Sequence, residues 1–461
     1  MIYDLIIIGG GPGGYHAAER AGHAGLNVLL IEKSSLGGVC LNEGCIPSKS
    51  LLYSAKIADN ARAGKRFGVV AENVTLDHKT VISRKNRVVK ALISGVFMKM
   101  KQNNVTVVMG EGMITGRTSD GFFNVKVQDV VYTSRKLLIA TGSVSSMPPI
   151  PGLDKGYQNG FVLTNREILD IQHVPERLAI IGGGVIGMEM ASYFNSAGSK
   201  VTVIEMLDHI GGFLDGEISS ILYSNYKKKG IDFILSAKVT SIKDGEVTYE
   251  TGEETKSVQA DKVLASIGRK PYVDNLGLET VGVEVHNGRI KTDEFLRTNV
   301  PGIYACGDVN GIMMLAHTAC REAEVCINHI LGKQDKMRYH AIPSVIYTSP
   351  EVAFVGDTAE SAAEKGLEVE TVKLPLAYCG RYVAENVGGD GIVKIITDKR
   401  EGVVLGVHMI GSYASEIIYG AAIMVENRMR VEDVRQIVFP HPTVCEVIKE
   451  AMFEFRDCYS G

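Results

Sequence analysis

Two cysteines with four residues between them are the first candidates for chemistry in this chain. Cys40 and Cys45 lie in the segment GGVCLNEGCIPSK, residues 37–49. Pro47 suits the first turn of a helix, where its missing N–H costs little, so we expect a helix to begin near Cys45. A helix N-terminus favours a thiolate and lowers the pKa of a cysteine. Cys40, in a glycine-flanked turn, is free to approach it; two buried structural thiols are the alternative interpretation.

A histidine and a carboxylate near the end of the chain form a second candidate pair. His441 lies between two prolines in the stretch PHPT, and Glu446 follows five residues later. Imidazole is the side chain that best removes a thiol proton near neutral pH. Glu446 could hold one ring nitrogen and favour the charged form. A turn residue next to proline is the alternative role for this histidine.

Two glycine-rich turns must position these groups. Each follows an apolar, strand-like run and has the pattern G-x-G-x-x-G: Gly9, Gly11 and Gly14, then Gly182, Gly184 and Gly187, 173 residues later. The first glycine makes the turn, the second lets the backbone approach a pyrophosphate, and the third lets helix and strand pack closely. A glutamate that can accept hydrogen bonds from ribose hydroxyls ends the next strand of each copy, Glu32 and Glu205. Two bound dinucleotides are predicted, rather than glycines that only ease tight turns.

The charge after the second turn bears on which dinucleotide binds there. Residues 206–212, which follow Glu205, contain no Arg or Lys. A 2′-phosphate would be repelled by Glu205 and would find no cation, so NAD is favoured over NADP.

Composition excludes several other classes of protein. The 461 residues include 51 glycines but only 13 prolines, and 45% are apolar, as expected for a chain that buries large cores. A net charge of −4 argues against a general nucleic-acid binder or membrane-surface binder. The longest apolar run, 178–188, is too short to span a bilayer, and no secretory signal is recognised. We expect no metal site and a cytoplasmic location, with a processed organelle form as the alternative.

These motifs together resemble the two-dinucleotide flavoprotein disulfide reductases over essentially the whole chain. The resemblance rests on the two nucleotide fingerprints, GGVCLNEGCIPSK, Thr141-Gly142, GIYACGD at 302–308, MLAH at 314–317, the stretch from Pro343 to Val352, and PHPT at 440–443. Val39, Glu43 and Cys445 depart from the pattern we expect, without removing a group that the chemistry needs.

The resemblance implies an α/β fold with two Rossmann-like dinucleotide-binding domains, for FAD and NAD, and a C-terminal α+β dimerisation domain. The expected order is an FAD domain over 1–145, an NAD domain over 146–270, a return to the central domain over 271–340, and an interface domain over 341–461.

The resemblance also implies the roles of individual residues. FAD would be held by the first fingerprint and by Glu32, Lys49, Gly112, Thr141, Gly142, Asp308 and Ala316. NAD would be held by the second fingerprint and by Glu205, Val239 and Gly268. Lys49 would lie beside the hydride-accepting nitrogen of the flavin, paired with Glu189, and a helix beginning near Met314 would point its N-terminus at the flavin.

The implied reaction passes two electrons through a Cys40–Cys45 disulfide. A dihydrolipoyl group on a protein of a 2-oxo acid dehydrogenase or glycine cleavage complex would attack the disulfide, with Cys40 as the exchange thiol. Cys45 would pass electrons to FAD, and NAD+ would become NADH. His441 would act from the partner subunit of a homodimer, with a cis bond to Pro442. The alternatives are a reductase of another disulfide, such as glutathione, and a structural subunit of a dehydrogenase complex.

The other cysteines are expected to have different roles. Cys306, Cys320 and Cys326 are predicted to pack in the core, because they lie among apolar or small residues. Cys379, Cys445 and Cys458 are isolated in sequence, which makes a redox pair in the C-terminal tail improbable.

Overall fold

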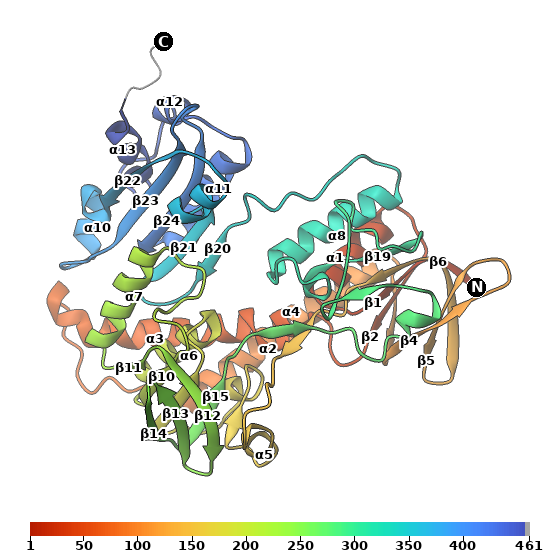
Figure 1. Ribbon diagram of the computed structural model, residues 1–461, viewed down its shortest axis with the longest axis horizontal. Helices are drawn as coiled ribbons and strands as arrows, with labels where there is room; N and C mark the ends of the chain where they lie inside the picture. Colours follow the sequence, from red (N-terminus) through yellow and green to blue (C-terminus); the bar gives the residue numbers. More distant parts are fainter. Residues whose placement is uncertain (457–461) are drawn as a thin grey trace.

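A mixed sheet, with parallel central strands and two antiparallel strands at one edge, forms the core of the N-terminal part of the chain (Figure 1). The computed structural model describes residues 1–456, so Cys458 lies outside the described residues. The sheet order is β3-β2-β1-β6-β5-β4, and β19 also pairs with β6. Its strands are β1 (Ile2–Ile8), β2 (Val28–Glu32), β3 (Thr106–Met109), β4 (Gly112–Arg117), β5 (Phe123–Val127), β6 (Val130–Ile139) and β19 (Ile303–Ala305). The central strands are buried on both faces: helices cover one face, and apolar residues of β4, β5 and the segment 276–300 cover the other.

Helices on this sheet position the first glycine turn and the cysteine pair. α1 (Pro12–His23) follows β1 directly and packs against α8 (Ala316–Ile330). The long helices α3 (Cys45–Ala63) and α4 (His78–Gln102) pack against each other, and α3 also contacts α6 (Val185–Ala197) of the second nucleotide domain. The cysteine pair therefore lies between the two nucleotide-binding parts.

The second sheet repeats the first nucleotide-binding arrangement. Five parallel strands lie in the order β11-β10-β9-β15-β8. They are β8 (Val162–Leu163), β9 (Arg177–Ile181), β10 (Lys200–Ile204), β11 (Asp232–Ile234) and β15 (Lys262–Ala265). α6 (Val185–Ala197) follows β9 as α1 follows β1, and α7 (Gly216–Lys228) follows β10. An antiparallel sheet of β12 (Ala237–Lys243), β13 (Glu246–Thr251) and β14 (Glu254–Gln259) flanks this domain.

A two-stranded ribbon joins the two nucleotide domains. The chain leaves the first domain along β7 (Ser143–Ser145) and returns along β16 (Arg269–Pro271), and the two strands pair antiparallel. The predicted boundaries at 145 and 270 fall on these strands, although the domain limits themselves stay a prediction.

An antiparallel sheet with helices forms the C-terminal part, at the upper left of Figure 1. The sheet order is β20-β21-β24-β23-β22. Its strands are β20 (Ser344–Ile346), β21 (Glu351–Gly356), β22 (Val369–Pro375), β23 (Ile392–Asp398) and β24 (Val404–Gly411), and its main helices are α11 (Ala414–Glu426), α12 (Val431–Arg435) and α13 (Glu446–Glu454). Two Rossmann-like sheets and this α+β unit confirm the predicted fold class. Among residues 1–456, no helix is long and apolar enough to cross a membrane.

Candidate active site

The two glycine turns have nearly the same backbone geometry. Gly11 and Gly184, which cap α1 and α6, both have φ −74° and ψ −172°. The first glycines, Gly9 and Gly182, have φ of 108° and 103°, a region that favours glycine. A Cβ on Gly9 would lie 2.2 Å from the carbonyl oxygen of Ala140, so these turns exclude other residues on steric grounds.

The second and third glycines of each turn differ in what surrounds them. A Cβ on Gly14 would lie 1.7 Å from the oxygen of Gly9, and one on Gly187 would lie 2.1 Å from the oxygen of Gly182. These glycines therefore allow the helix to pack tightly on its strand. A Cβ on Gly184 would meet nothing within 4 Å. This open space at a helix N-terminus is where a pyrophosphate can approach the backbone.

A glutamate braces each turn. The Oε2 atom of Glu32 accepts a hydrogen bond from the N–H of Gly10 at 2.7 Å, and Oε2 of Glu205 accepts one from Gly183 at 2.5 Å. The other oxygen of Glu205 accepts from the N–H of Leu207 at 2.8 Å. Both carboxylates thus lie at the edge of a glycine turn, where ribose hydroxyls can reach them.

The cysteine pair lies at the junction of two helices. Cys45 is the first residue of α3, as expected from Pro47. The expectation of a turn around Cys40 was wrong, since Cys40 lies within the short helix α2 (Gly38–Glu43). Left-handed backbone at Gly37 and Gly38 starts this helix, and the N–H of Gly37 donates to the oxygen of Gly10 at 2.8 Å. The segment that contains Cys40 and Cys45 is thereby held against the first glycine turn.

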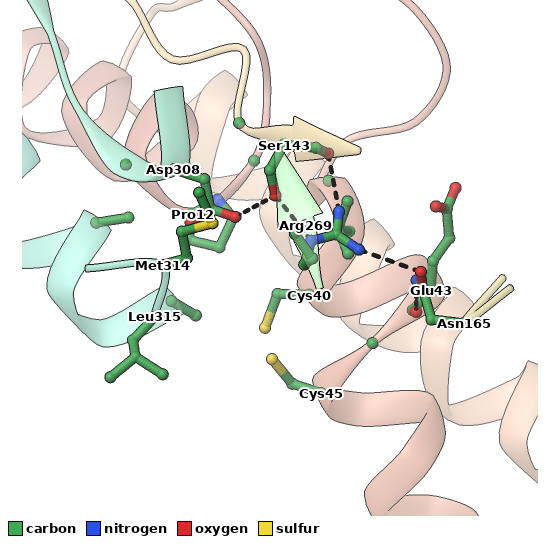
Figure 2. Close-up of a pocket in the computed structure, with 18 of the residues that line it drawn as sticks. Pro12, Cys40, Glu43, Cys45, Ser143, Asn165, Arg269, Asp308, Met314 and Leu315 are labelled. Atoms are coloured by element: carbon green, nitrogen blue, oxygen red, sulfur yellow. Dashed lines mark hydrogen bonds between the residues drawn. The ribbon is translucent and has the colours of Figure 1, made fainter. Parts of the chain in front are cut away.

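The two sulfurs differ strongly in their ability to ionise. Both cysteines are free thiols in the lining of one cavity, and their sulfur atoms point toward each other (Figure 2). The hydrogen bond from Cys40 and the charge of Lys49 lower the pKa of Cys45 to about 7, against the opposing effect of burial. The hydrogen bond to Cys45 and burial raise the pKa of Cys40 well above its ordinary range. Cys45 is therefore the sulfur that carries the negative charge.

Lys49 and Glu189 meet across the two nucleotide domains. The Nζ atom of Lys49 lies 2.8 Å from Oε1 and 2.9 Å from Oε2 of Glu189. The Glu189 side chain is only 5% exposed and also accepts a hydrogen bond from the N–H of Tyr347 at 3.1 Å. The Tyr347 ring lies under the ammonium group, whose distance to the ring centroid is 4.5 Å. A buried carboxylate needs such partners, so this contact fixes the Lys49 side chain one turn after Cys45.

A single large cavity connects these groups. Its volume is about 1560 Å³, above the usual range for small-molecule sites. Its lining includes, of the predicted residues, Gly9, Gly11, Glu32, Cys40, Cys45, Lys49, Gly112, Thr141, Gly142, Glu189, Asp308 and Ala316. The cavity thus runs from the first glycine turn, past the sulfurs, to the N-terminus of α8, which begins two residues after the predicted Met314.

Comparisons with known proteins agree with this geometry. Residues 3–323 match the family described as pyridine nucleotide-disulphide oxidoreductase, and residues 342–452 match its dimerisation domain. This chain belongs to the pyridine nucleotide-disulphide oxidoreductase family. The match between 3 and 323 covers both glycine turns and the cysteine pair, and the second match covers His441 and Glu446.

Several relatives are similar over nearly their full length. The dihydrolipoyl dehydrogenase of Bacillus subtilis is 39% identical, covering 97% of this chain and 95% of the relative. The mitochondrial dihydrolipoyl dehydrogenase of Sus scrofa is 38% identical, covering 97% of this chain and 89% of the relative. Among solved structures, LpdA of Mycobacterium tuberculosis has a TM-score of 0.88 at 26% identity, with 98% of this chain and 99% of that chain covered.

A second solved structure is similar to the same degree. The HOCl-induced flavoprotein disulfide reductase RclA of Escherichia coli has a TM-score of 0.86 at 27% identity, with 98% of this chain and 100% of that chain covered.

The family uses FAD and NAD, and the residues present fit both. The first glycine turn, Glu32 and the cavity between Asp308 and α8 offer a continuous site for an extended flavin dinucleotide. The open Gly184 cradle and Glu205 lie at the start of α6, whose residues Val185 and Ile186 line the same cavity. A nucleotide on this turn can therefore reach the cavity that contains Cys45.

Some predicted cofactor residues lie outside the cavity lining. Gly14, Gly182, Gly184, Gly187, Glu205, Val239 and Gly268 are not part of it. Val239 is a buried core residue of β12, whereas Gly268 is exposed just before β16. The roles of these two residues in NAD binding stay predictions.

The predicted base is not next to the cysteines of its own chain. Nδ1 of His441 lies 2.9 Å from Oε1 of Glu446, and the peptide bond to Pro442 is cis. The other carboxylate oxygen accepts from the N–H of Thr443 at 2.9 Å, and this hydrogen bond, followed by that of His441, lowers the pKa of Glu446. The His441 side chain is 78% exposed and does not line the cavity. The structure therefore brings His441 and Glu446 together, but outside the cavity that Cys40 and Cys45 line.

Sequence reasoning missed an arginine at the centre of the site (Figure 2). Arg269 of β16 donates from Nε to Ser143 Oγ at 2.8 Å and from Nη2 to the Ser143 carbonyl at 2.8 Å. Its Nη1 atom donates to Asn165 Oδ1 at 3.1 Å. A possible signal was its place after a buried parallel strand, β15, because functional groups of α/β folds gather at the carboxyl ends of strands.

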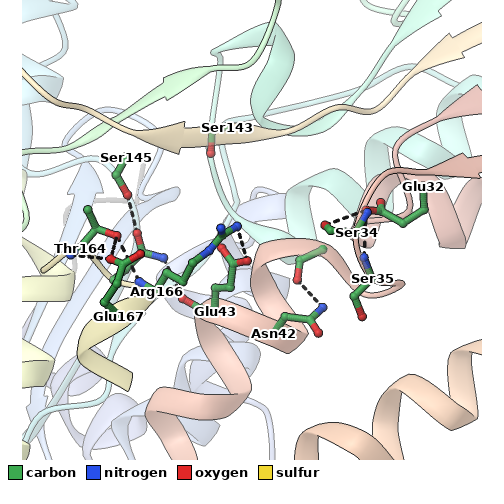
Figure 3. Close-up of polar contacts among 12 residues, drawn as sticks. Glu32, Ser34, Ser35, Asn42, Glu43, Ser143, Ser145, Thr164, Arg166 and Glu167 are labelled. Carbon is green, nitrogen blue, oxygen red and sulfur yellow. Dashed lines mark hydrogen bonds and ion pairs between the residues drawn. The ribbon is translucent and has the colours of Figure 1, made fainter. Parts of the chain in front are cut away.

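Two other departures noted in the sequence have structural explanations. Glu43 forms an ion pair with Arg166, with 2.5 Å between Oε1 and Nη2 (Figure 3). Cys445 contacts Thr443, with 3.0 Å between Sγ and Oγ1. Cys306 and Cys326 are buried as predicted, whereas Cys320 is only partly buried. None of these residues replaces or blocks a member of the Cys40 and Cys45 pair.

Proposed function

We propose that this chain is a dihydrolipoyl dehydrogenase, which oxidises a protein-bound dihydrolipoyl group and reduces NAD+. The observation that carries the proposal is the pair of free thiols at the cavity, with Cys45 at the start of α3 one turn before Lys49. This arrangement lowers the pKa of Cys45 and raises that of Cys40. Relatives named dihydrolipoyl dehydrogenase, 37–39% identical over almost the whole chain, support the choice of substrate.

The reaction begins with the Cys40–Cys45 disulfide. One thiolate of the dihydrolipoyl group attacks the Cys40 sulfur, the S–S bond breaks, and Cys45 leaves as a thiolate. The second substrate thiol then attacks the mixed disulfide, so that lipoyl disulfide is released and Cys40 becomes a thiol. A low pKa makes Cys45 the better leaving group, which explains its place at a helix N-terminus.

FAD, which the first glycine turn and Glu32 would hold, would supply the two-electron relay between the sulfur pair and NAD+. The overall balance is dihydrolipoyl dithiol plus NAD+ giving lipoyl disulfide, NADH and one proton. Lys49 holds its charge beside Cys45 because Glu189 anchors its ammonium group. That charge stabilises the thiolate before the electrons leave.

Proton removal from the substrate requires a second subunit. His441, oriented by Glu446, takes the proton from the attacking thiol as a general base. We infer a homodimer, in which this base reaches the sulfur pair of the partner. The interface domain offers apolar side chains for such contact, among them Tyr378, Val387, Tyr419, Val438 and Phe453, which are all more than half exposed.

The electron donor is proposed to be a lipoyl-bearing protein of a 2-oxo acid dehydrogenase or glycine cleavage complex. A cytoplasmic location is proposed with it, because thiols such as buried Cys306 and Cys326 persist in reducing compartments.

A substrate panel tests the function. The purified holoenzyme is assayed with dihydrolipoamide, with a lipoyl protein in its dithiol form and, in the reverse direction, with glutathione disulfide, using both NAD and NADP. We expect dihydrolipoyl oxidation with NAD. Faster turnover of glutathione disulfide, or a preference for NADP, would refute the proposal.

Replacing one sulfur tests the site. Cys45→Ser is expected to abolish dihydrolipoamide turnover while leaving electron transfer from NADH to an artificial dye acceptor. Cys379→Ser is the matched control, because Cys379 is buried in the interface domain away from the cavity. Undiminished dihydrolipoamide turnover by Cys45→Ser would show that the sulfur pair is not the redox centre.

A further inference from the structure

Arg269 occupies an unusual position for a cation. It lines the cavity and is the first residue of β16, on the ribbon through which the chain returns from the NAD domain. Within residues 1–456, no carboxylate forms an ion pair with it. Burial lowers the pKa of its guanidinium, and the more distant charges of Asp308 and Glu43 act in the opposite direction. Even a partly buried cation is costly when no anion contacts it. Such a charge is retained where an anion forms beside it.

The hydrogen bonds of Arg269 extend toward the flavin side of the cavity through Ser143. The Ser143 hydroxyl accepts from Arg269 and donates to Oδ2 of Asp308 at 2.5 Å (Figure 2). Because a hydroxyl can donate and accept at once, the carboxylate and the guanidinium are linked without touching. Asp308 also lines the cavity. The position of its carboxylate therefore depends on Arg269.

A second branch extends toward the sulfur pair through Asn165. Its Oδ1 atom accepts from Arg269 and also from Ser145 Oγ at 2.6 Å. Its Nδ2 atom donates to the carbonyl of Glu43 at 2.8 Å. Glu43 ends α2, and only Gly44 separates it from Cys45. One guanidinium thus holds the ribbon and, through one amide, the peptide that joins the two cysteine-bearing helices.

We propose that Arg269 is a positioning residue that ties the interdomain ribbon to the redox pair and offsets the negative charge formed in the cavity when that pair is reduced. Its position gives it this role, because both connections between the two nucleotide domains run through the paired strands β7 and β16. The inference rests on the proposed function only in that Cys45 becomes a thiolate on reduction.

Charge and geometry can be separated by two substitutions at this position. Arg269→Met removes the charge and all the guanidinium hydrogen bonds. Arg269→Lys keeps the charge, but its single ammonium group cannot donate to Ser143 and Asn165 at the same time. Lys270→Met is the matched control, since Lys270 is the next residue of β16, is exposed, and loses the same charge. Asn165→Ala breaks the link to Glu43 and changes no charge.

The measurements are the equilibrium between NADH and the sulfur pair in the holoenzyme, and the stopped-flow rate of that reduction. A unit charge acting over roughly 10 Å at an effective dielectric constant of about 20 changes an equilibrium about tenfold. We therefore expect Arg269→Met to lower the equilibrium constant for reduction about tenfold, or about 30 mV for two electrons. Arg269→Lys and Asn165→Ala should keep the equilibrium within about twofold and slow reduction about tenfold. Lys270→Met should change neither.

Several results would overturn the proposal. Equal equilibrium constants for reduction in wild type and Arg269→Met would show that Arg269 does not offset the charge of the reduced pair. Wild-type reduction rates in Arg269→Lys and Asn165→Ala would show that Arg269 does not position the ribbon. If Arg269→Met cannot be loaded with FAD, the reduction rates of Arg269→Lys and Asn165→Ala still test the positioning role. Because no lipoyl substrate enters these measurements, a failure of the proposed function in wild type would be seen separately.

Discussion

The ionisation of Cys45 gives the most direct test of the site. Its pKa of about 7 means that about half of this sulfur is thiolate at pH 7. An ordinary cysteine, with a pKa of about 8.5, is only about 3% ionised there. The hydrogen bond from Cys40 is the largest cause, the charge of Lys49 is a smaller one, and burial and the charge of Glu189 act in the opposite direction.

The perturbation is therefore Cys40→Ala, compared with Lys49→Met. Without this hydrogen bond, the effect of burial, which raises the pKa of Cys45, is less opposed. The thiolate fraction at pH 7 should therefore fall from about half to below about a tenth. Lys49→Met should shift the pKa in the same direction by less, because Cys40 still donates. Both variants favour the neutral thiol, and their reactivity should recover as the pH rises.

The assay is the rate of alkylation of Cys45 by iodoacetamide in the dithiol form of the holoenzyme. The rate is measured from pH 5 to 9 by peptide mass mapping. Cys320→Ala is the control, because burial raises the pKa of Cys320 to about 12 and keeps it protonated over this range. An inflection that stays near pH 7 in Cys40→Ala, or that moves further in Lys49→Met, would refute the reasoning.

Two further predictions concern the base and the second nucleotide turn. His441→Gln should slow dihydrolipoamide oxidation by about 10²–10⁴, as expected for a lost general base, and should leave dye reduction by NADH unchanged; an unchanged steady-state rate with dihydrolipoamide would exclude the base. Gly182→Ala should lower the free energy of unfolding by about 1–3 kcal/mol, because the new Cβ would lie 2.4 Å from the oxygen of Ser266 at a φ of 103°. Gly184→Ala, with nothing within 4 Å, should leave stability nearly unchanged and weaken NADH binding. Equal stabilities of the two variants in urea, or wild-type NADH affinity in Gly184→Ala by titration, would contradict this account of the turn.

Features that act over a few residues could be predicted from the sequence. The glycine turns, the glutamates that brace them and the helix start at Cys45 depend on backbone conformation and on neighbours along the chain. Continuous apolar runs before the two glycine turns likewise indicated strands, because the central strands of such sheets are buried on both faces. The short helix that contains Cys40 was missed, since left-handed glycines and packing on the first turn stabilise it more than its own residues do.

Contacts between distant segments were decided by the tertiary structure. Lys49 and Glu189 are 140 residues apart, and their approach was expected only from the family resemblance. Arg269, 126 residues from Ser143 and 104 from Asn165, had no local pattern that revealed its partners. The sequence by itself determined the cysteine pair as a candidate for redox chemistry and the two glycine turns, because both depend on neighbouring residues. The tertiary structure alone decided which charges meet, because that depends on how the ribbon closes and how the two nucleotide domains pack.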